Sequence, residues 1–438
     1  MPTLRRSLGL GHVIFFGIGS ILGAGIYTLI GKVAGEAGNL TWLAFLIASF
    51  TAFLTAFSYA ELSAAFPRSG GEYVYAQKAF GQRTGTAVGF LIALNGIISA
   101  ATVSLGFAGY FIELVNVPMI PVALGIIVLL LAVNIFGIKG SSTVNIVLTA
   151  LEILGLVAVG IAAFPHVGSV DLLALPDGNI NGLFFAAALS FFAYMGFEDI
   201  VKLAEETRFP ERNIPRALFI ANGVVLLIYV GLAVLVVSAM PWQQLATETA
   251  PLAAIVENTW GRTGVIMIGV AALFSTSNTL LSNLMGSSRV LSYMGRELPG
   301  MRWLGTVSQR KTPVNALVFI AAIVCALALI GDIAIVARIA TVSIFLTFLL
   351  VNISVIVLRW REPELVRPYK MPFHMGRVPV IPVVAIACTL VLLGFTVAAL
   401  LGGASQGEGI GLLRGAMASP DDVPLTVAGI GDGSFGQY

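Results

Sequence analysis

Charged residues are scarce in this sequence. Asp, Glu, Lys and Arg together make up 11% of its 438 residues, whereas a soluble domain averages about 25%. The formal net charge is only +2, and no basic stripe with interleaved aromatic residues is present. The composition therefore argues against a soluble domain and against a protein that binds nucleic acid.

Cysteine and histidine are also scarce. The two cysteines, Cys325 and Cys388, both lie inside apolar stretches. We interpret them as small hydrophobic residues rather than as a disulfide or a metal pair. The three histidines are scattered, and the sequence has no obvious nucleophile–base pair. We therefore expect neither an enzyme nor a cofactor, and no metal site built from cysteine and histidine.

Long apolar runs are what the sequence has in abundance. Hydrophobic residues make up 58% of the chain, and the mean hydropathy is +0.95. A run of about 18 or more apolar residues can cross the roughly 30 Å hydrocarbon core of a bilayer. We predict an all-α polytopic membrane protein with a transporter domain over residues 1–404 and a polar tail over 405–438. Its eleven spans lie, within a few residues, at 10–33, 39–66, 84–111, 120–138, 142–164, 180–204, 216–240, 262–294, 314–331, 333–358 and 380–402.

The positions of lysine and arginine predict the orientation of these spans. With the N-terminus in the cytoplasm, twenty of the 24 basic residues fall on the cytoplasmic side, as the positive-inside rule requires. Arg5 and Arg6 precede the first run as they would in a signal peptide. The run is longer than a signal peptide needs and lacks a clear cleavage site, so we expect it to be retained. The predicted location is the plasma (inner) membrane.

Two of the predicted spans are interrupted. The first contains residues 17–27 (GIGSILGAGIY), with four glycines in eleven residues. A glycine inside a helix costs up to about 1 kcal/mol relative to alanine, and irregular backbone survives at mid-membrane depth only beside protein or a cavity. The sixth span is apolar as far as Gly196, and then Glu198 and Asp199 follow. Interruptions five spans apart predict inverted repeats of spans 1–5 and 6–10.

Four motifs lie at these interruptions and at the cytoplasmic ends of the spans. They are residues 23–27 (GAGIY), 58–62 (SYAEL) with 67–75 (PRSGGEYVY), 191–198 (FFAYMGFE) with 204–206 and 210–217, and 287–289 (SSR) with Tyr293 and 312–313. Together they resemble the amino acid–polyamine–organocation (APC) superfamily of permeases, in its amino acid permease branch. The resemblance implies a five-plus-five inverted-repeat transporter fold with broken first and sixth helices. Members of this family usually have twelve spans, and a twelfth is not visible after Leu401.

The interruption in the first span is a candidate binding site for a carboxylate. An unwound helix exposes N–H groups at the start of its second half, where the helix dipole favours an anion. We therefore expect the amides around Ala24 and Gly25 to hold the carboxylate of an amino acid. The alternative interpretation is that the glycines only allow the helices to pack closely.

The resemblance supplies the other half of the candidate site. It implies that carbonyl groups near Ile21, Phe192 and Met195 hold the α-amino group of the substrate. It also implies that an aromatic residue at the sixth-span interruption covers the substrate, and Phe192 and Phe197 are the candidates. Packing against lipid or protein is the alternative for both phenylalanines.

Glu152 is central to the fifth span, where many members of the family have a lysine. A buried charge is costly, so Glu152 could take up and release a proton near neutral pH. It could instead help to hold Na⁺ together with carbonyls of Gly17 and Ile18 and hydroxyls of Ser275 or Thr276. A third interpretation is a neutral glutamic acid that forms hydrogen bonds between helices. The departure from lysine means that the family's lysine mechanism does not carry over directly.

Charged residues near the cytoplasmic ends suggest two sets of contacts. Glu61, with Arg68 and Arg289 nearby in topology, is expected to form a polar network at an inner gate. Lys202 and Glu206 are four residues apart, a spacing that allows them to pair on one helix face.

These observations predict a secondary-active amino acid transporter that works by alternating access and couples to a proton or to Na⁺. We expect a neutral substrate, because no second acid or base is dedicated to a charged side chain, although Glu198 could accept one. Glu198 is either a gating and proton-sensing group, as in the family, or a carboxylate at a helix start. The alternatives are an amino acid exchanger, a polyamine or organic-cation permease on the same fold, and a sensor that binds amino acids without transporting them.

Overall fold

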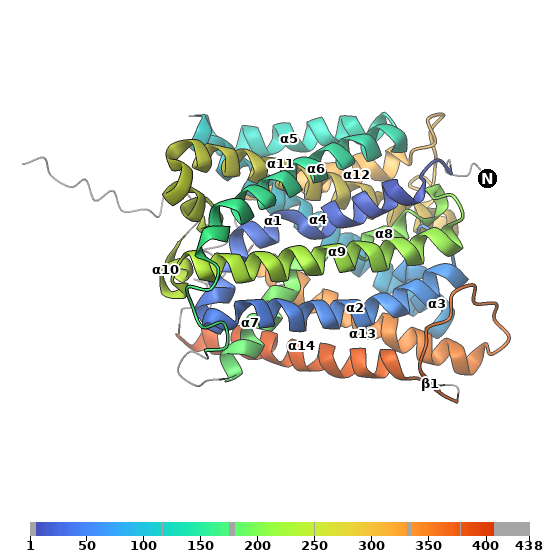
Figure 1. The fold of residues 1–438 in the computed structure, drawn as a ribbon. Coiled ribbons are helices and arrows are strands. Elements are labelled where there is room, and N and C mark those ends of the chain that lie inside the picture. The colour runs from blue at the N-terminus through green and yellow to red at the C-terminus, as the bar shows by residue number, and fades with distance from the viewer. Residues whose placement is uncertain are drawn as a thin grey trace, which may run out of the picture.

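The computed structural model describes residues 6–115, 117–174, 180–248, 250–330, 334–376 and 378–406. Residues 407–438 of the predicted tail lie outside the described residues. The long helices run side by side in one bundle (Figure 1). In chain order the helical elements are α1 (Leu10–Ala37), η1 (Gly38–Leu40), α2 (Thr41–Ala65), α3 (Glu72–Phe80), α4 (Gln82–Leu114), α5 (Met119–Ile135), α6 (Ile138–Ala163), η2 (Phe164–His166), α7 (Ile180–Ala193), α8 (Asp199–Lys202), η4 (Ala204–Glu206), α9 (Pro210–Ala239), α10 (Trp242–Thr247), α11 (Pro251–Glu297), η5 (Pro299–Met301), α12 (Val314–Ile330), α13 (Ala334–Arg361) and α14 (Val380–Gln406).

The helices confirm an all-α polytopic membrane protein. Eight helical segments of the described chain are long and apolar enough to cross a membrane, and three shorter apolar helices lie among them. Each of the eleven predicted spans falls on one of these helices. Between α13 and α14, the strands β1 (His374–Met375) and β2 (Val378–Pro379) form a small antiparallel pair, with His374 opposite Pro379.

Several of the helix contacts occur in pairs that exchange the two halves of the chain. α1 contacts α9, and α2 contacts α7; α6 contacts α11, and α13 contacts α4; α6 contacts α9, and α13 contacts α2. The first five spans are α1, α2, α4, α5 and α6, and their counterparts are α7 with α8, α9, α11, α12 and α13, in that order. When every helix is exchanged for its counterpart, the first contact of each pair becomes the second. We interpret spans 1–5 and 6–10 as inverted repeats on this basis.

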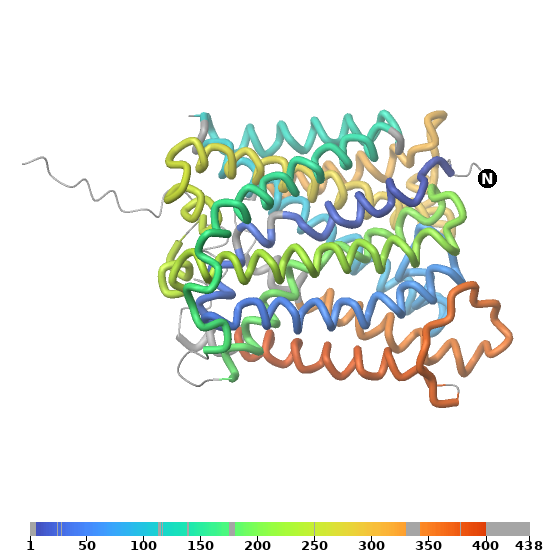
Figure 2. Tube along the Cα trace, in the orientation of Figure 1, coloured from blue at the N-terminus to red at the C-terminus, as the bar shows by residue number. Residues whose placement is uncertain are grey.

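The first span lies at the centre of this arrangement and packs against the sixth. α1 contacts α2, α6, α7, α9 and α11, and its trace passes between those of α6 and α9 (Figure 2). Because other helices surround α1, irregular backbone within it is shielded from lipid, as a membrane requires.

Candidate functional site

Both predicted interruptions are present, and they touch each other. α1 leaves helical geometry at Gly23, which has φ 21° and ψ −176°. The sixth span is divided into α7 and α8 by a turn over residues 194–198. Within that turn Gly196 has φ 116°, a conformation that favours glycine. A Cβ atom on Gly196 would overlap the carbonyl oxygen of Ser20, so the two interrupted backbones are in direct contact.

The hydroxyl of Tyr229 in α9 faces carbonyl groups from both interruptions. Its oxygen lies 2.9 Å from the carbonyl oxygen of Ile21, 3.1 Å from that of Leu22 and 3.1 Å from that of Ala193. A tyrosine hydroxyl has one proton and donates to one acceptor at a time. The three carbonyl groups can therefore accept further hydrogen bonds. They suit a group with several N–H donors, such as an ammonium. The sequence signal for this residue is a lone polar side chain in the aliphatic stretch 223–237.

We expect the Tyr229→Phe variant to be less stable without substrate, because the variant leaves buried carbonyls at the interruptions without their donor. An unsatisfied buried polar group costs about 1–3 kcal/mol, and thermal unfolding of the purified protein would measure the loss. Tyr75→Phe is the matched control, since the Tyr75 hydroxyl is buried and has no hydrogen-bond partner among the described residues. Equal unfolding temperatures for the two variants would contradict this assignment.

A small polar cavity of about 70 Å³ lies beside the two interruptions. It is lined by Ser20 of α1, by Met195, Gly196, Glu198, Asp199 and Lys202 of the sixth span, by Glu72 of α3, by Ile92, Asn95, Gly96 and Ser99 of α4, by Thr279 and Asn283 of α11 and by Ile344 of α13. The cavity therefore joins the two interrupted spans to the helices that surround them.

Of the predicted substrate-binding residues, Met195 alone lines this cavity, and the others lie at the interruptions beside it. Ile21 offers its carbonyl to Tyr229, and Met195 lines the cavity. Ala24 and Gly25 follow the break in α1, and a Cβ on Gly25 would lie 3.2 Å from the Cα of Ala193 in α7. The amides predicted to bind a carboxylate thus begin the second half of the broken helix.

The two candidate aromatic residues differ in burial. Phe197 is fully buried, with its ring centroid 5.4 Å from that of Tyr59 and 5.2 Å from that of Phe348. Phe192 is 42% exposed, while its neighbour Phe191 is buried and stacks on Phe345 with centroids 4.7 Å apart. The aromatic packing at this end of α7 therefore involves Phe191 rather than Phe192.

Glu152 is fully buried between α6 and α11. The hydroxyl of Ser275 donates to its Oε1 at 2.6 Å, and the hydroxyl of Tyr27 lies 3.3 Å from its main-chain carbonyl. Its Oε2 is buried and accepts no hydrogen bond from the described residues. The side chain of Asn278 also interacts with the carboxyl group, and it donates a 2.8 Å hydrogen bond to the hydroxyl of Thr149. Glu152 thus lies in a polar contact between helices with one oxygen unsatisfied.

The other residues predicted for ion coupling are not all at Glu152. Only Ser275 contacts its carboxyl group, whereas the hydroxyl of Thr276 donates to the carbonyl of Ala272 in its own helix at 2.8 Å. Ile18 is buried. A side chain at Gly17 would meet Ile200 of α8, which places that face of α1 against the sixth span.

The charged residues at the start of α8 form a local cluster. Lys202 Nζ lies 2.6 Å from Asp199 Oδ1, and the Ser20 hydroxyl donates to Asp199 Oδ2 at 2.8 Å. Glu198 Oε2 accepts a 2.8 Å hydrogen bond from the amide of Gly196. The predicted pair of Lys202 and Glu206 is wrong, because Lys202 pairs with Asp199 one turn earlier in α8 and Glu206 pairs with Arg289 of α11.

The polar network predicted around Glu61 also has different partners from those expected. Glu61 pairs with Arg359 of α13 at 2.6 Å and with Arg367 at 3.4 Å. Arg289 instead makes a two-pronged contact with Glu206 at 2.9 and 3.2 Å. The prediction of a network around Glu61 holds, but its partners come from the tenth span and the loop that follows it, which the order of residues near Glu61 does not indicate.

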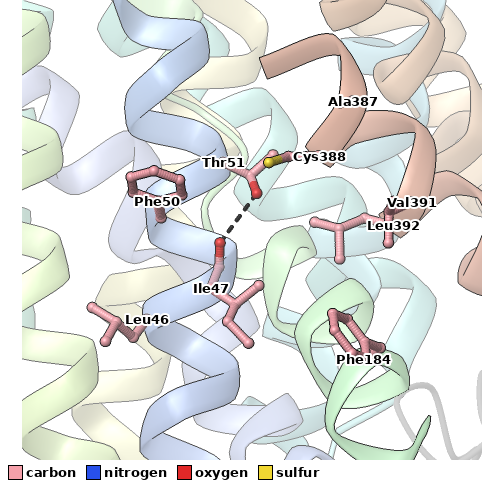
Figure 3. Close-up of a pocket in the computed structure, with 9 residues that line it drawn as sticks. All are labelled: Leu46, Ile47, Phe50, Thr51, Phe184, Ala387, Cys388, Val391 and Leu392. Atoms are coloured by element: carbon pink, nitrogen blue, oxygen red, sulfur yellow. Dashed lines mark hydrogen bonds between the residues drawn. The ribbon is translucent and has the colours of Figure 1, made fainter. Parts of the chain in front are cut away.

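A larger cavity of about 530 Å³ lies apart from these residues, between α2, α7 and α14 (Figure 3). Leu46, Phe50, Phe184 and Leu392 are among its apolar lining residues. The hydroxyl of Thr51 is already used, since it donates to the carbonyl of Ile47 at 3.1 Å. This cavity offers no charged group to a zwitterion, so the two interruptions, with the polar cavity beside them, remain the candidate site.

Known proteins resemble this chain over most of its length. A family model described as amino acid permease matches residues 8–410. An uncharacterized transporter of Mycobacterium tuberculosis is 32% identical over 403 residues, covering 90% of this chain and 91% of that protein. The branched-chain amino acid permease BcaP of Bacillus subtilis is 28% identical, covering 89% and 88%. The vacuolar cationic amino acid transporter 4 of Arabidopsis thaliana is 30% identical, covering 82% of this chain and 64% of that protein.

Proposed function

Because the chain belongs to the amino acid permease family, we propose that it transports a neutral amino acid together with a proton by alternating access. The observation that carries the proposal is the meeting of carbonyls from both interrupted spans at Tyr229. These carbonyls would hold the ammonium group of the amino acid. The amides that follow Gly23 would hold its carboxylate, so that one site satisfies both poles of a zwitterion.

The burial of Glu152 supports proton coupling. The family's lysine is replaced here by a carboxyl group that has no positively charged partner among the described residues. An isolated carboxylate in a low-dielectric interior is costly, and a bound proton removes that cost. Sodium coupling has less support, because Thr276 and Gly17 make other contacts.

A neutral substrate and alternating access are supported by the charged pairs. Asp199 and Lys202 are engaged with each other at the cavity, so neither is dedicated to a substrate side chain. The buried pairs Glu61–Arg359 and Glu206–Arg289 tie α2 to α13 and η4 to α11. In this proposal they separate when the cytoplasmic side opens, as one helix bundle moves against the other.

A panel of radiolabelled amino acids offered to proteoliposomes tests this function. We expect uptake of a neutral amino acid to rise with an inward proton gradient, to collapse with a protonophore and to persist without sodium. If no amino acid is taken up but one of them stabilises the protein against heat, the sensor is the better assignment. Uptake that requires sodium would contradict proton coupling.

A further inference from the structure

Carboxyl groups outnumber cations at the polar cavity. Glu72, Glu198 and Asp199 supply three carboxyls, and Lys202 is the one cation that lines the cavity among the described residues. None of these four residues is more than 6% exposed. With every group ionised, the cluster would bury an excess of two negative charges, which is costly in a low-dielectric interior.

Glu72 is the least satisfied of the three acids. Asp199 is held by Lys202 and Ser20, and Glu198 by the amide of Gly196. Glu72 Oε1 accepts a 3.0 Å hydrogen bond from the hydroxyl of Tyr59. Its Oε2 is buried and has no hydrogen-bond partner among the described residues.

Among the residues that the structure describes, the elements packed around Glu72 bring no further cation to it. α2 contributes Tyr59, α3 itself contributes Tyr75, and the sixth span contributes Glu198, Asp199 and Lys202. The cavity-lining polar residues of α4 and α11 are uncharged. The arginines at the end of α13 are engaged elsewhere, Arg359 with Glu61 and Arg361 with the carbonyl of Ala79.

This balance of charges favours a proton on Glu72. Glu72 belongs to the short helix α3, outside the membrane-spanning helices, and burial raises its pKa. Lys202 opposes that shift, while Asp199 adds to it. A proton on Glu72 would remove the charge of the least satisfied carboxyl group and reduce the excess charge of the cluster from two to one.

We propose that Glu72 is a second proton-binding site, whose proton enters the cavity and leaves it together with the amino acid. The inference rests on the proposed function, because it takes the polar cavity as the compartment that opens to each side in turn. Glu152 and Glu72 would then each carry one proton per transport cycle.

The number of protons that move with each amino acid distinguishes this proposal from coupling through Glu152 alone. With the membrane potential clamped at zero, each coupled proton allows about tenfold substrate accumulation per pH unit, equivalent to about 1.4 kcal/mol. Under a gradient of one unit we expect accumulation of about 100-fold for the wild type and about tenfold for Glu72→Gln. Glu72→Asp retains a carboxyl group and should stay near the wild type.

Three results would overturn the inference or the function beneath it. If the wild type and Glu72→Gln both accumulate substrate about tenfold, transport uses one proton and Glu72 carries none. If lysine or arginine is the preferred substrate and Glu72→Gln removes only that preference, the carboxyl contacts a cationic side chain instead. If no variant responds to the gradient, the proposed function itself fails.

A second variant protects the test against misfolding of Glu72→Gln. Tyr59→Phe removes the hydroxyl that stabilises the charged carboxyl through Oε1. If Glu72 takes up a proton, the pH of half-maximal substrate exchange should move upward in Tyr59→Phe. An unchanged pH profile would count against Glu72 as the proton site.

Discussion

Replacing Glu152 with glutamine should reduce substrate accumulation under a pH gradient of one unit by a factor of about ten. That factor is the contribution of one coupled proton, about 1.4 kcal/mol per pH unit. Glutamine keeps the size of the side chain and can still accept the hydrogen bond from Ser275. Exchange of internal for external substrate should therefore continue, because it needs no net proton movement.

The controls for this variant come from the same helix bundle. Glu257→Gln removes an exposed acid of α11 and should leave accumulation unchanged. Accumulation by Glu152→Gln at the wild-type ratio would show that Glu152 is not a coupling group. It would then be a neutral side chain that joins α6 to α11.

Replacing Gly196 with alanine should lower transport by about 100-fold. The new Cβ would overlap the carbonyl of Ser20, and the backbone has φ 116°. Strained backbone costs about 1–3 kcal/mol, and overpacking adds about 1–3 kcal/mol. If the transport-competent state is destabilised by about 3 kcal/mol, its population falls by roughly a factor of 100, and the transport rate falls with it. Initial rates of uptake in proteoliposomes measure the effect.

Gly223→Ala is the matched control for the Gly196 variant. A Cβ at Gly223 meets no atom within 4 Å, and this residue lies in the regular helix α9. We expect its transport to remain within about twofold of the wild type, since alanine is the better helix former. Equal transport by the two variants would mean that the contact between the interruptions is unimportant.

The sequence could predict features that depend on local pattern. Apolar run length located all eleven spans, and the glycines before Tyr27 and the acids after Phe197 located the two interruptions. Each of these signals is contained in a few consecutive residues, because lipid penalises charged side chains and frayed backbone wherever they occur.

Contacts between distant helices could not be predicted in this way. The partner of Glu61 is Arg359, almost three hundred residues later, and Tyr229 reaches Ile21 from the seventh span. Neighbouring residues on a helix also point about 100° apart. An error of one position in judging which residue faces the protein interior therefore selects Phe192 in place of Phe191. The buried position of Glu72 depends on how α3 packs, which its sequence does not indicate.

The central claim is that the two interrupted spans together form the amino acid site, and a structure with a bound amino acid tests it most directly. We expect the carboxylate at the amides of Ala24 and Gly25, and the ammonium at the carbonyls of Ile21 and Ala193 beside the Tyr229 hydroxyl. An amino acid bound away from both interruptions would contradict the account.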